Sequence, residues 1–321
     1  MINGVKHFLN TIPIPICGLI LGTVSLGNLL FAEGFKVTGN AFCLVGILVM
    51  ILFLLKLIFT FKRTLADLKN PIVASVAPTF TMSLMVISVV LERAFPKCIM
   101  NDLLWLTAIG LHLGLMVYFV VVHILPVDIT LEYVYPSWFI TFVGIGVIPN
   151  TSAVFIKELG EIVVWIALFL YFALLPVILR RIMFQKMTEA SAVPLITILT
   201  APGSLCLAGY LSVFKDGSTW FVVLMLILSQ AIYFCVVLYM KKMLEVGFYP
   251  SYAAFTFPLV ISATAMFKSS QFFMDRPILF GATELLSIVE TILAIAVVCY
   301  VLLKYAVHLY GQTKSLLAQH E

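Results

Sequence analysis

The side chains that most often carry out chemistry are few in this sequence and stand far apart. The 321 residues include 15 Asp and Glu, 5 His and 6 Cys. His112 and His123 share one helical face, but 11 residues at about 1.5 Å each place them roughly 16 Å apart. They cannot share a metal ion, so we expect no metal site and no cofactor.

The cysteines and acids show no catalytic pattern. The 6 cysteines have neither a C-x-x-C motif nor paired spacing, and most lie in or beside apolar segments, where a free Cys acts as a small hydrophobe. An intramembrane protease or acyltransferase would need a nucleophile with a base, paired aspartates or clustered ligands within such segments. No such set is present in the sequence. We therefore do not expect an enzyme.

Two polar features inside apolar segments each allow two interpretations. Glu290 is either a proton-coupling or gating carboxylate, or a residue that hydrogen-bonds a neighbouring helix or reaches the membrane interface. Asn150, Thr151 and Ser152 follow Pro149, and they either line a vestibule or cap a local break. The sequence leaves both questions open.

The composition is that of a membrane protein. Hydrophobic residues make up 63% of the chain and charged residues 11%, and the mean hydropathy is +1.15. Soluble domains are about a quarter charged and below half apolar, and a fold of this size could not bury so much apolar surface. The net charge of +4 is small, and no basic run is interleaved with aromatic residues. We therefore expect lipid contacts and no nucleic-acid partner.

A helix needs about 20 apolar residues to cross the hydrocarbon core. Ten segments meet this length, short polar connections separate them, and the whole chain 1–321 is expected to be a single transmembrane domain. The expected fold is therefore an all-α integral membrane protein. The ten spans are about 12–31, 38–61, 72–91, 103–125, 137–156, 160–179, 191–214, 219–240, 250–267 and 281–308.

The basic residues predict the orientation of these spans. With ten spans both termini lie on one side, and that side collects 12 of the 19 Lys and Arg residues against 7 on the other. Because cytoplasmic connections carry the excess of Lys and Arg, we expect both termini to be cytoplasmic.

Odd-numbered and even-numbered spans differ in composition. Odd spans start about every 60 residues, which indicates a repeat of helical hairpins. Ten of the 14 prolines lie in or at the start of odd spans, and Pro176 is the one proline inside an even span. A proline inside a helix frees a backbone carbonyl, which is costly in lipid unless protein or water satisfies it. The odd helices are therefore expected to form an inner ring around a central pore.

Small and hydroxylated residues are also concentrated in the odd spans. Close helix packing alone is sufficient for Gly18-x-x-x-Gly22, but it does not account for five broken helices of the same kind. The central stretches of these helices carry no ionised side chain. Such a pathway suits anions better than cations, and it would also tolerate a neutral solute. The pore-lining candidates are Gly18, Gly22, Ser83, Thr200 and Thr264.

Two motifs carry a family resemblance. They are Pro13-x-Pro15-x-x-Gly18-x-x-x-Gly22 in the first span and the segment Tyr-Ala-Ala-Phe-Thr-Phe-Pro-Leu at 252–259 in the ninth. With the hairpin repeat, they resemble the tellurite-resistance/dicarboxylate transporter (TDT) family, which includes bacterial TehA and the plant slow anion channels of guard cells. The resemblance extends over nearly the whole chain. One departure is Ala253, where members often carry Trp or Tyr.

The resemblance implies a fold and a function. Family members have five helical hairpins per subunit, assemble as trimers and move chloride, nitrate, sulfite, malate or related anions. It thus implies a homotrimer in a bacterial inner (plasma) membrane, with small anions as partners. In the family a phenylalanine beside Pro or Gly plugs the pore, and the matching residues here are Phe257 and Pro258. Gly18 matches a position where close approach to that ring matters.

The local sequence is consistent with a gate at Phe257. Pro258 has no amide hydrogen, so the Ala254 carbonyl loses its helical partner and the helix should bend. Phe255 and Phe257 are about 200° apart around a helix, so at most one faces the axis. We therefore expect an anion channel or transporter gated by a phenylalanine. The alternative is a proton-coupled C4-dicarboxylate (malate-type) carrier, or a sulfite or tellurite-related exporter of the same family.

Overall fold

The computed structural model of the chain describes residues 2–185 and 189–318, and within these ranges it contains helices and connecting turns but no strand. Eight segments are long and apolar enough to cross a membrane, and two shorter apolar segments occupy the positions of the expected first and fifth spans. The prediction of an all-α membrane fold with ten helical segments in five hairpins is confirmed. The long segments are Lys36–Asp67, Pro71–Ala94, Ile99–Ile124, Lys157–Phe184, Ala190–Val213, Thr219–Leu244, Pro250–Phe272 and Pro277–Lys314, and the short ones are Ile16–Ala32 and Trp138–Val154.

The five odd-numbered segments, here called the inner segments, are mostly broken into pieces. Breaks lie at or close to prolines because these residues interrupt the backbone hydrogen-bond ladder. The first is the unbroken α2 (Ile16–Ala32). The others are α4 (Pro71–Val76) with α5 (Thr79–Ala94); α7 (Trp138–Val143), η3 (Gly144–Gly146), α8 (Val147–Thr151) and η4 (Ser152–Val154); η5 (Ala190–Leu199) with α10 (Thr200–Val213); and η6 (Pro250–Phe255) with α12 (Thr256–Phe272).

The five even-numbered segments, here called the outer helices, run almost without interruption. The first two are α3 (Lys36–Asp67) and α6 (Ile99–Phe119), which continues into the π-helical turn η1 (Val120–Ile124). The other three are α9 (Lys157–Phe184), α11 (Thr219–Leu244) and α13 (Pro277–Ala318). Two further elements, α1 (Ile2–Thr11) and η2 (Leu131–Tyr133), lie outside the hairpins.

The inner segments form a closed ring. Helix α2 packs against α5, α5 against α8, α8 against α10, α10 against α12, and α12 returns to α2. Each outer helix packs against the inner segment of its own hairpin, as α3 does on α2 and α13 on α12. Two concentric layers result, with the broken segments inside and the continuous helices around them.

Burial separates the two layers. In the inner segments that qualify as long spans, 78 to 94% of the most apolar stretch is buried, against 22 to 39% in the outer helices. The outer helices expose large apolar side chains such as Leu48, Phe169, Ile227 and Leu303. An exposed apolar surface of this extent matches a lipid environment.

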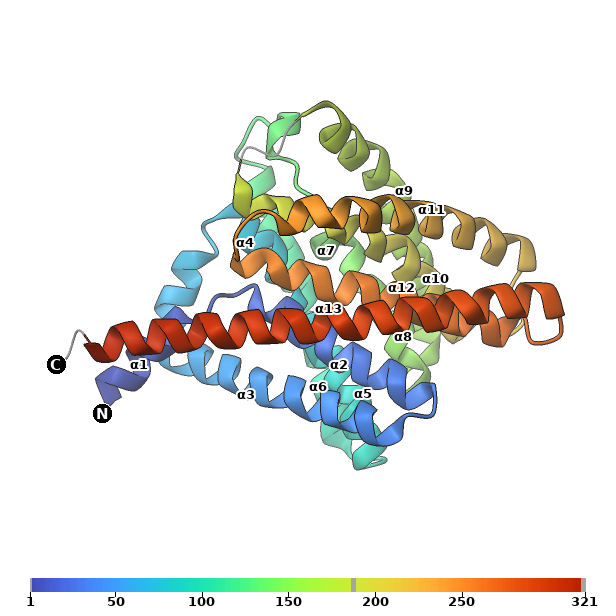
Figure 1. Cartoon of the computed structure of the whole chain (residues 1–321), viewed down its shortest axis with the longest axis horizontal. Helices are drawn as coiled ribbons and strands as arrows, with labels where there is room; N and C mark the ends of the chain where they lie inside the picture. The colour runs from blue at the N-terminus through green and yellow to red at the C-terminus, as the bar shows by residue number, and fades with distance from the viewer. Residues whose placement is uncertain (1, 186–188, 319–321) are drawn as a thin grey trace.

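The start of α1 and the end of α13 lie at the same end of the bundle. Helix α1 packs against α13, and Figure 1 shows the start of α1 and the end of the long α13 together at the left of the view. We call this end the terminal side and the opposite end the far side. The inner segments run from the terminal side to the far side, so the proline-rich starts of all five meet at one end.

Candidate functional site

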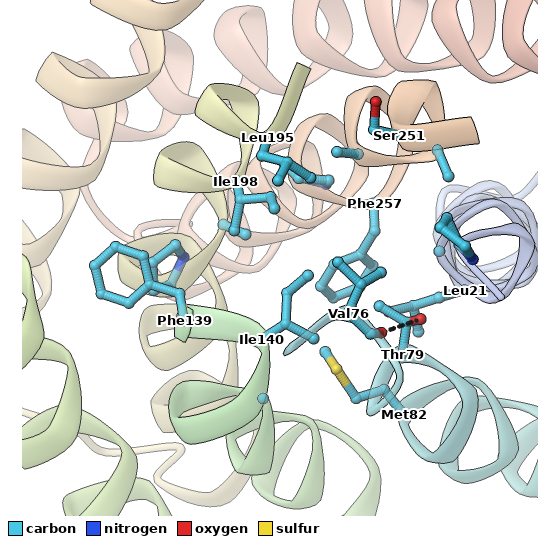
Figure 2. Close-up of a pocket in the computed structure, with 18 of the residues that line it drawn as sticks. Leu21, Val76, Thr79, Met82, Phe139, Ile140, Leu195, Ile198, Ser251 and Phe257 are labelled. Carbon is cyan, nitrogen blue, oxygen red and sulfur yellow. Dashed lines mark hydrogen bonds between the residues drawn. The ribbon is translucent and has the colours of Figure 1, made fainter. Parts of the chain in front are cut away.

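All five inner segments line a cavity on the terminal side. About 720 Å³ of empty space lies there. Of its 22 lining residues only Thr79 and Ser251 have polar side chains, and the Thr79 hydroxyl donates to the Val76 carbonyl oxygen over 2.8 Å. Figure 2 shows the apolar side chains that converge on this terminal-side cavity. None of the described residues that line it carries a charge that could hold an ion in place.

A second cavity opens toward the far side, and we call it the far-side vestibule. It contains about 850 Å³ of empty space and is lined by the second halves of α2, α5 and α12, together with α8 and Leu205 of α10. Its polar side chains include two cations and no acid among the described residues. These polar residues are Ser25, Asn28, Arg93, Asn150, Thr151, Thr264 and Lys268.

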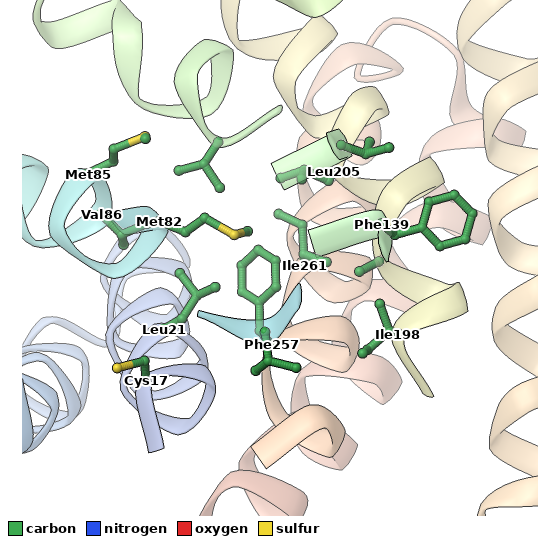
Figure 3. Packing of buried hydrophobic residues seen from close by; sticks show 14 of the residues in the cluster. Cys17, Leu21, Met82, Met85, Val86, Phe139, Ile198, Leu205, Phe257 and Ile261 are labelled. Carbon is green, nitrogen blue, oxygen red and sulfur yellow. The ribbon is translucent and has the colours of Figure 1, made fainter. Parts of the chain in front are cut away.

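Phe257 lies between the two cavities. It lines both of them, as does Leu205 on the neighbouring inner helix α10. The ring is 8% exposed and points toward Met82 of α5 in both close-up views (Figures 2 and 3). Phe257 follows the junction at which the 3-10 turn η6 changes to α12, and Pro258 comes directly after it. The ring therefore stands at the boundary between an apolar chamber and a positively charged one.

The backbone of α12 is held at this boundary by α2. The Thr256 hydroxyl donates to the Gly18 carbonyl oxygen over 3.1 Å. A Cβ atom on Gly22 would lie 2.4 Å from the Thr256 hydroxyl oxygen and 2.8 Å from the Phe257 nitrogen. Only glycine permits this approach, so the position of the Phe257 backbone depends on Gly22.

Arg93, in the last turn of α5, is held by neutral groups. Its guanidinium donates to the Asn28 side-chain oxygen over 3.1 Å and stacks on the Phe31 ring at 3.8 Å from the ring centroid. A second nitrogen donates to the Asn40 side-chain oxygen over 3.4 Å. None of these partners carries a negative charge.

Lys268 of α12 is held in a similar way on the other side of the vestibule. Its ammonium donates to the Asn150 side-chain oxygen and to the Ala208 carbonyl oxygen, both over 3.3 Å, and also to the Ser212 hydroxyl. Asn150 is itself fixed, because its amide donates to the carbonyls of Gly146 and Leu205. Within residues 2–185 and 189–318, neither Lys268 nor Arg93 forms an ion pair with a carboxylate.

The two cations give the vestibule a net positive charge. Neutral hydrogen-bond partners orient the charges without cancelling them, and low-dielectric walls strengthen the field that they produce. An anion that arrives from the far side is therefore attracted, and a cation is repelled. The arrangement favours the passage of negatively charged solutes.

The structure divides the residues expected to line a pore. Gly18 and Pro258 line the terminal-side cavity, and Thr264 lines the far-side vestibule. Gly22 faces Thr256 instead. Ser83 is buried, with its hydroxyl 3.1 Å from the Cys17 carbonyl oxygen, and Thr200 donates to the Thr197 carbonyl oxygen within its own segment. These last three residues lie between helices and line neither cavity.

The structure also shows the positions of Phe255, the two histidines and the polar residues after Pro149. Phe255 is 1% exposed and packs edge-on against Tyr252, away from both cavities. His112 contacts the Thr81 hydroxyl and His123 the Leu68 carbonyl oxygen, so the two histidines do not meet. Asn150 and Thr151 line the vestibule, and the Thr151 hydroxyl also accepts from the Trp105 indole over 2.8 Å.

Sequence reasoning missed the two vestibule cations because it assigned both to connections. Helix α12 continues to Phe272, five residues beyond the expected end of the ninth span at 267. No Gly or Pro interrupts Ser269, Ser270 and Gln271, and this could have indicated that the helix continues past Lys268. Arg93 lies in the last turn of α5, two residues past the expected end at 91.

Residues 11–308 match the family described as SLAC1, voltage-dependent anion channel. The chain is also similar to two proteins of Methanocaldococcus jannaschii that are named as uncharacterized transporters. It is 28% identical to MJ0762 over 154 residues, 44% of each chain, so the match spans less than half of that relative. It is 27% identical to MJ0576 over 259 residues, 70% of this chain and 72% of the relative. The apolar outer layer and the two cavities are consistent with this match, which extends over most of the sequence. The chain belongs to the SLAC1 family of voltage-dependent anion channels.

Proposed function

We propose that each subunit passes small anions along the axis of the five inner segments and that Phe257 is the gate. The observation that carries this proposal is the place of the Phe257 ring, which lines both the terminal-side cavity and the far-side vestibule. A phenyl ring in an apolar neck blocks hydrated ions by size and by dewetting. Conduction then requires the ring to change rotamer or the α12 backbone to shift.

Substitution of Phe257 by Ala tests the gate. The variant removes the ring between the two cavities, so anion flux into proteoliposomes under a clamped potential should rise at least about tenfold, equivalent to about 1.4 kcal/mol of barrier. Phe255→Ala is the matched control, because it removes a ring of the same size two residues away. It should cost about 3 to 5 kcal/mol of stability and leave the flux per folded molecule unchanged. A folded Phe257→Ala protein with wild-type flux would show that the gate lies elsewhere.

The lining of the terminal-side cavity favours a channel over a dicarboxylate carrier. A carrier for C4-dicarboxylates needs groups that bind both carboxylates before the barrier moves, and this cavity contributes only apolar side chains, Thr79 and Ser251. An anion-substitution series separates the two mechanisms. Flux set by voltage and linear in anion concentration supports a channel, whereas saturable flux driven by a pH gradient would favour the proton-coupled carrier.

We further propose that the terminal side is cytoplasmic and that the chain forms a homotrimer in a bacterial inner membrane. The orientation rests on the Lys and Arg bias of 12 to 7 toward this side. Labelling of a cysteine at position 2 or 320 from outside intact cells would contradict the orientation. Native mass spectrometry of the detergent-solubilised protein measures the number of subunits.

A further inference from the structure

Glu290 is a buried carboxylate that the proposed pathway does not use. It lies on the outer helix α13, is 1% exposed, and lines neither the terminal-side cavity nor the far-side vestibule. Neither of its two carboxylate oxygens forms a hydrogen bond of normal geometry within the described residues, although Gln230 and Ser262 lie close enough to interact with it. A carboxylate in this state is rare inside a membrane protein and calls for a physical reason.

The surroundings of Glu290 are also incompletely bonded. The carboxyl faces Gln230 of α11 and Ser262 of α12, with Tyr233 of α11 close by. The Gln230 amide donates to the Ser262 hydroxyl over 3.3 Å, but the Gln230 side-chain oxygen and the Tyr233 hydroxyl have no partner in the part of the chain that the structure describes. Three residues thus carry four buried oxygen atoms without partners where α11, α12 and α13 pack. Together with Ser262, we call Glu290, Gln230 and Tyr233 the Glu290 cluster.

Among the residues that the structure describes, no cation forms an ion pair with Glu290. Lys268, the charged residue of α12, is bonded to Asn150, Ala208 and Ser212 in the vestibule. The group that α2 brings nearby is another acid, Glu33, which accepts from the Thr291 hydroxyl over 2.9 Å.

The remaining charged groups on these elements lie farther along the bundle. Glu284 is exposed toward the far-side end of α13. The basic residues of α11 and α13 lie toward the terminal side, where α1 and η6 also contact α13. They are Lys241, Lys242, Lys304 and Lys314.

One bound proton would give the Glu290 cluster both a neutral carboxyl group and an additional hydrogen-bond donor. An ionised carboxylate buried without a cation costs several kcal/mol, and protonation removes that charge. It also creates one O–H donor. The carboxyl O–H can then donate to the Gln230 side-chain oxygen, which an ionised carboxylate cannot do. The added proton thus removes the buried charge and gives the Gln230 oxygen a donor.

We propose that the Glu290 cluster is a proton-binding site that holds the gate helix α12 in its closed packing. Ser262, the α12 member of the cluster, follows Phe257 by five residues on the same helix, so the inference rests on the gate proposed above. With its proton, Glu290 ties α13 to α12 through Gln230 and Ser262. Loss of the proton to water leaves an unpaired charge behind α12, which weakens this packing and favours displacement of the Phe257 ring. Anion flux should therefore rise as the pH rises.

The test measures anion flux in proteoliposomes against pH, with the same pH on both sides. Wild-type flux should rise severalfold from acidic to alkaline pH, whereas Glu290→Gln, which keeps the shape of the neutral acid, should stay low and flat. Glu284→Gln is the matched control, because it removes an exposed carboxylate from the same helix and should keep the wild-type pH response. A Glu290→Gln variant with the wild-type pH response would overturn the proposal.

A second readout does not depend on flux. Infrared difference spectra should show the carbonyl band of a protonated carboxylic acid that disappears as the pH rises in wild type and is missing in Glu290→Gln. An identical band in both proteins would also overturn the proposal. Phe257→Ala separates this inference from the gate itself. If that variant leaves flux unchanged, the gate proposal fails, while the infrared titration still decides whether Glu290 binds the proton.

Discussion

The two cavities on either side of Phe257 differ in what they offer an ion. The terminal-side cavity is enclosed mainly by Leu, Ile, Val and Pro side chains, and its lining among the described residues carries no charge. The far-side vestibule carries Arg93 and Lys268, each held by amide, hydroxyl or carbonyl oxygens. The first region resists any hydrated ion, and the second attracts one sign of charge.

This difference assigns two tasks to two places. Charge selection belongs to the vestibule, where fixed cations act on an ion that still keeps its water. In the function proposed above, restriction of flow belongs to the apolar neck at Phe257, where the ion must lose water or the ring must move. Changes in the vestibule should therefore alter which ions pass, and changes in the neck should alter how many.

The largest effect within the vestibule is expected from reversal of the Lys268 charge. Lys268→Glu lowers the charge of the vestibule by two units. The interaction energy of one unit charge with a monovalent anion about 5 Å away is roughly 3 kcal/mol at an effective dielectric constant of about 20. After screening by salt, anion flux should fall about tenfold, and the ratio of anion to cation permeability should fall with it. Reversal potentials under a salt gradient measure this ratio.

Lys215→Glu is the control for Lys268→Glu, because Lys215 is an exposed lysine in the connection between α10 and α11 and does not line the vestibule. Lys268→Gln, which removes the charge without adding an opposite one, should give an intermediate value. If Lys215→Glu and Lys268→Glu shift the reversal potential equally, the vestibule does not select the ion.

Neutralisation of Arg93 should have a smaller effect that depends on salt. Arg93→Gln should reduce anion flux about threefold near 0.1 M salt, where the screening length is about 10 Å, and hardly at all near 1 M, where it is about 3 Å. Arg93→Lys keeps the charge and should stay close to wild type. A loss of flux that is the same at both salt concentrations would indicate damage to the fold instead.

Reporter cysteines should separate the two regions by access. In a background without the native cysteines, Thr264→Cys in the vestibule should react from the far side faster with an anionic thiol reagent than with a cationic one, by about fivefold. Ala201→Cys lines the terminal-side cavity beyond Phe257, so it should be shielded from the far side. Thr200→Cys, one residue away but packed between helices, should react with neither reagent. Equal reaction rates of the cysteines at positions 264 and 201 would contradict the prediction that Phe257 forms a barrier between the two cavities.

The smallest effect is expected at a polar residue that lines neither cavity. Ser83→Ala removes a buried hydroxyl that bridges the carbonyls of Cys17 and Thr79. We expect a loss of about 1 kcal/mol of stability, seen as a lower midpoint of thermal denaturation in detergent. The anion flux per folded molecule should not change.

Much of the fold could be read from local patterns. The lengths of the apolar runs predicted ten helical segments, and the concentration of prolines in alternate runs predicted which five would be enclosed. Four of these five are also broken, whereas the first, α2, is continuous because Pro13 and Pro15 lie before its start. The boundaries were less accurate where no breaker follows, as at Lys268, since a helix continues into polar residues at no great cost beyond the hydrocarbon core. The first and fifth segments are shorter than expected because Pro13 and Pro15 precede the first and the fifth breaks into 3-10 turns.

The candidate site was only partly predictable. Pro258 marked the place where the helix breaks, and spacing showed that Phe255 and Phe257 face different directions. Small hydroxylated residues did not show which of them face the axis. Thr264 lines the vestibule, whereas Thr200 and Ser83 use their hydroxyls within and between helices.

The sequence by itself determined the membrane fold, the hairpin repeat and the division into inner and outer segments, because each depends on hydrophobicity and backbone chemistry that act along one stretch of chain. Only the tertiary structure decided that Arg93 and Lys268 face one vestibule and that Phe257 separates it from the apolar cavity. It also decided that Glu290 meets Gln230 and Ser262 and forms no ion pair with a cation in the described part of the chain. These arrangements depend on how helices far apart in the sequence are rotated against one another, and that rotation is set by close contacts such as Gly22 on Thr256.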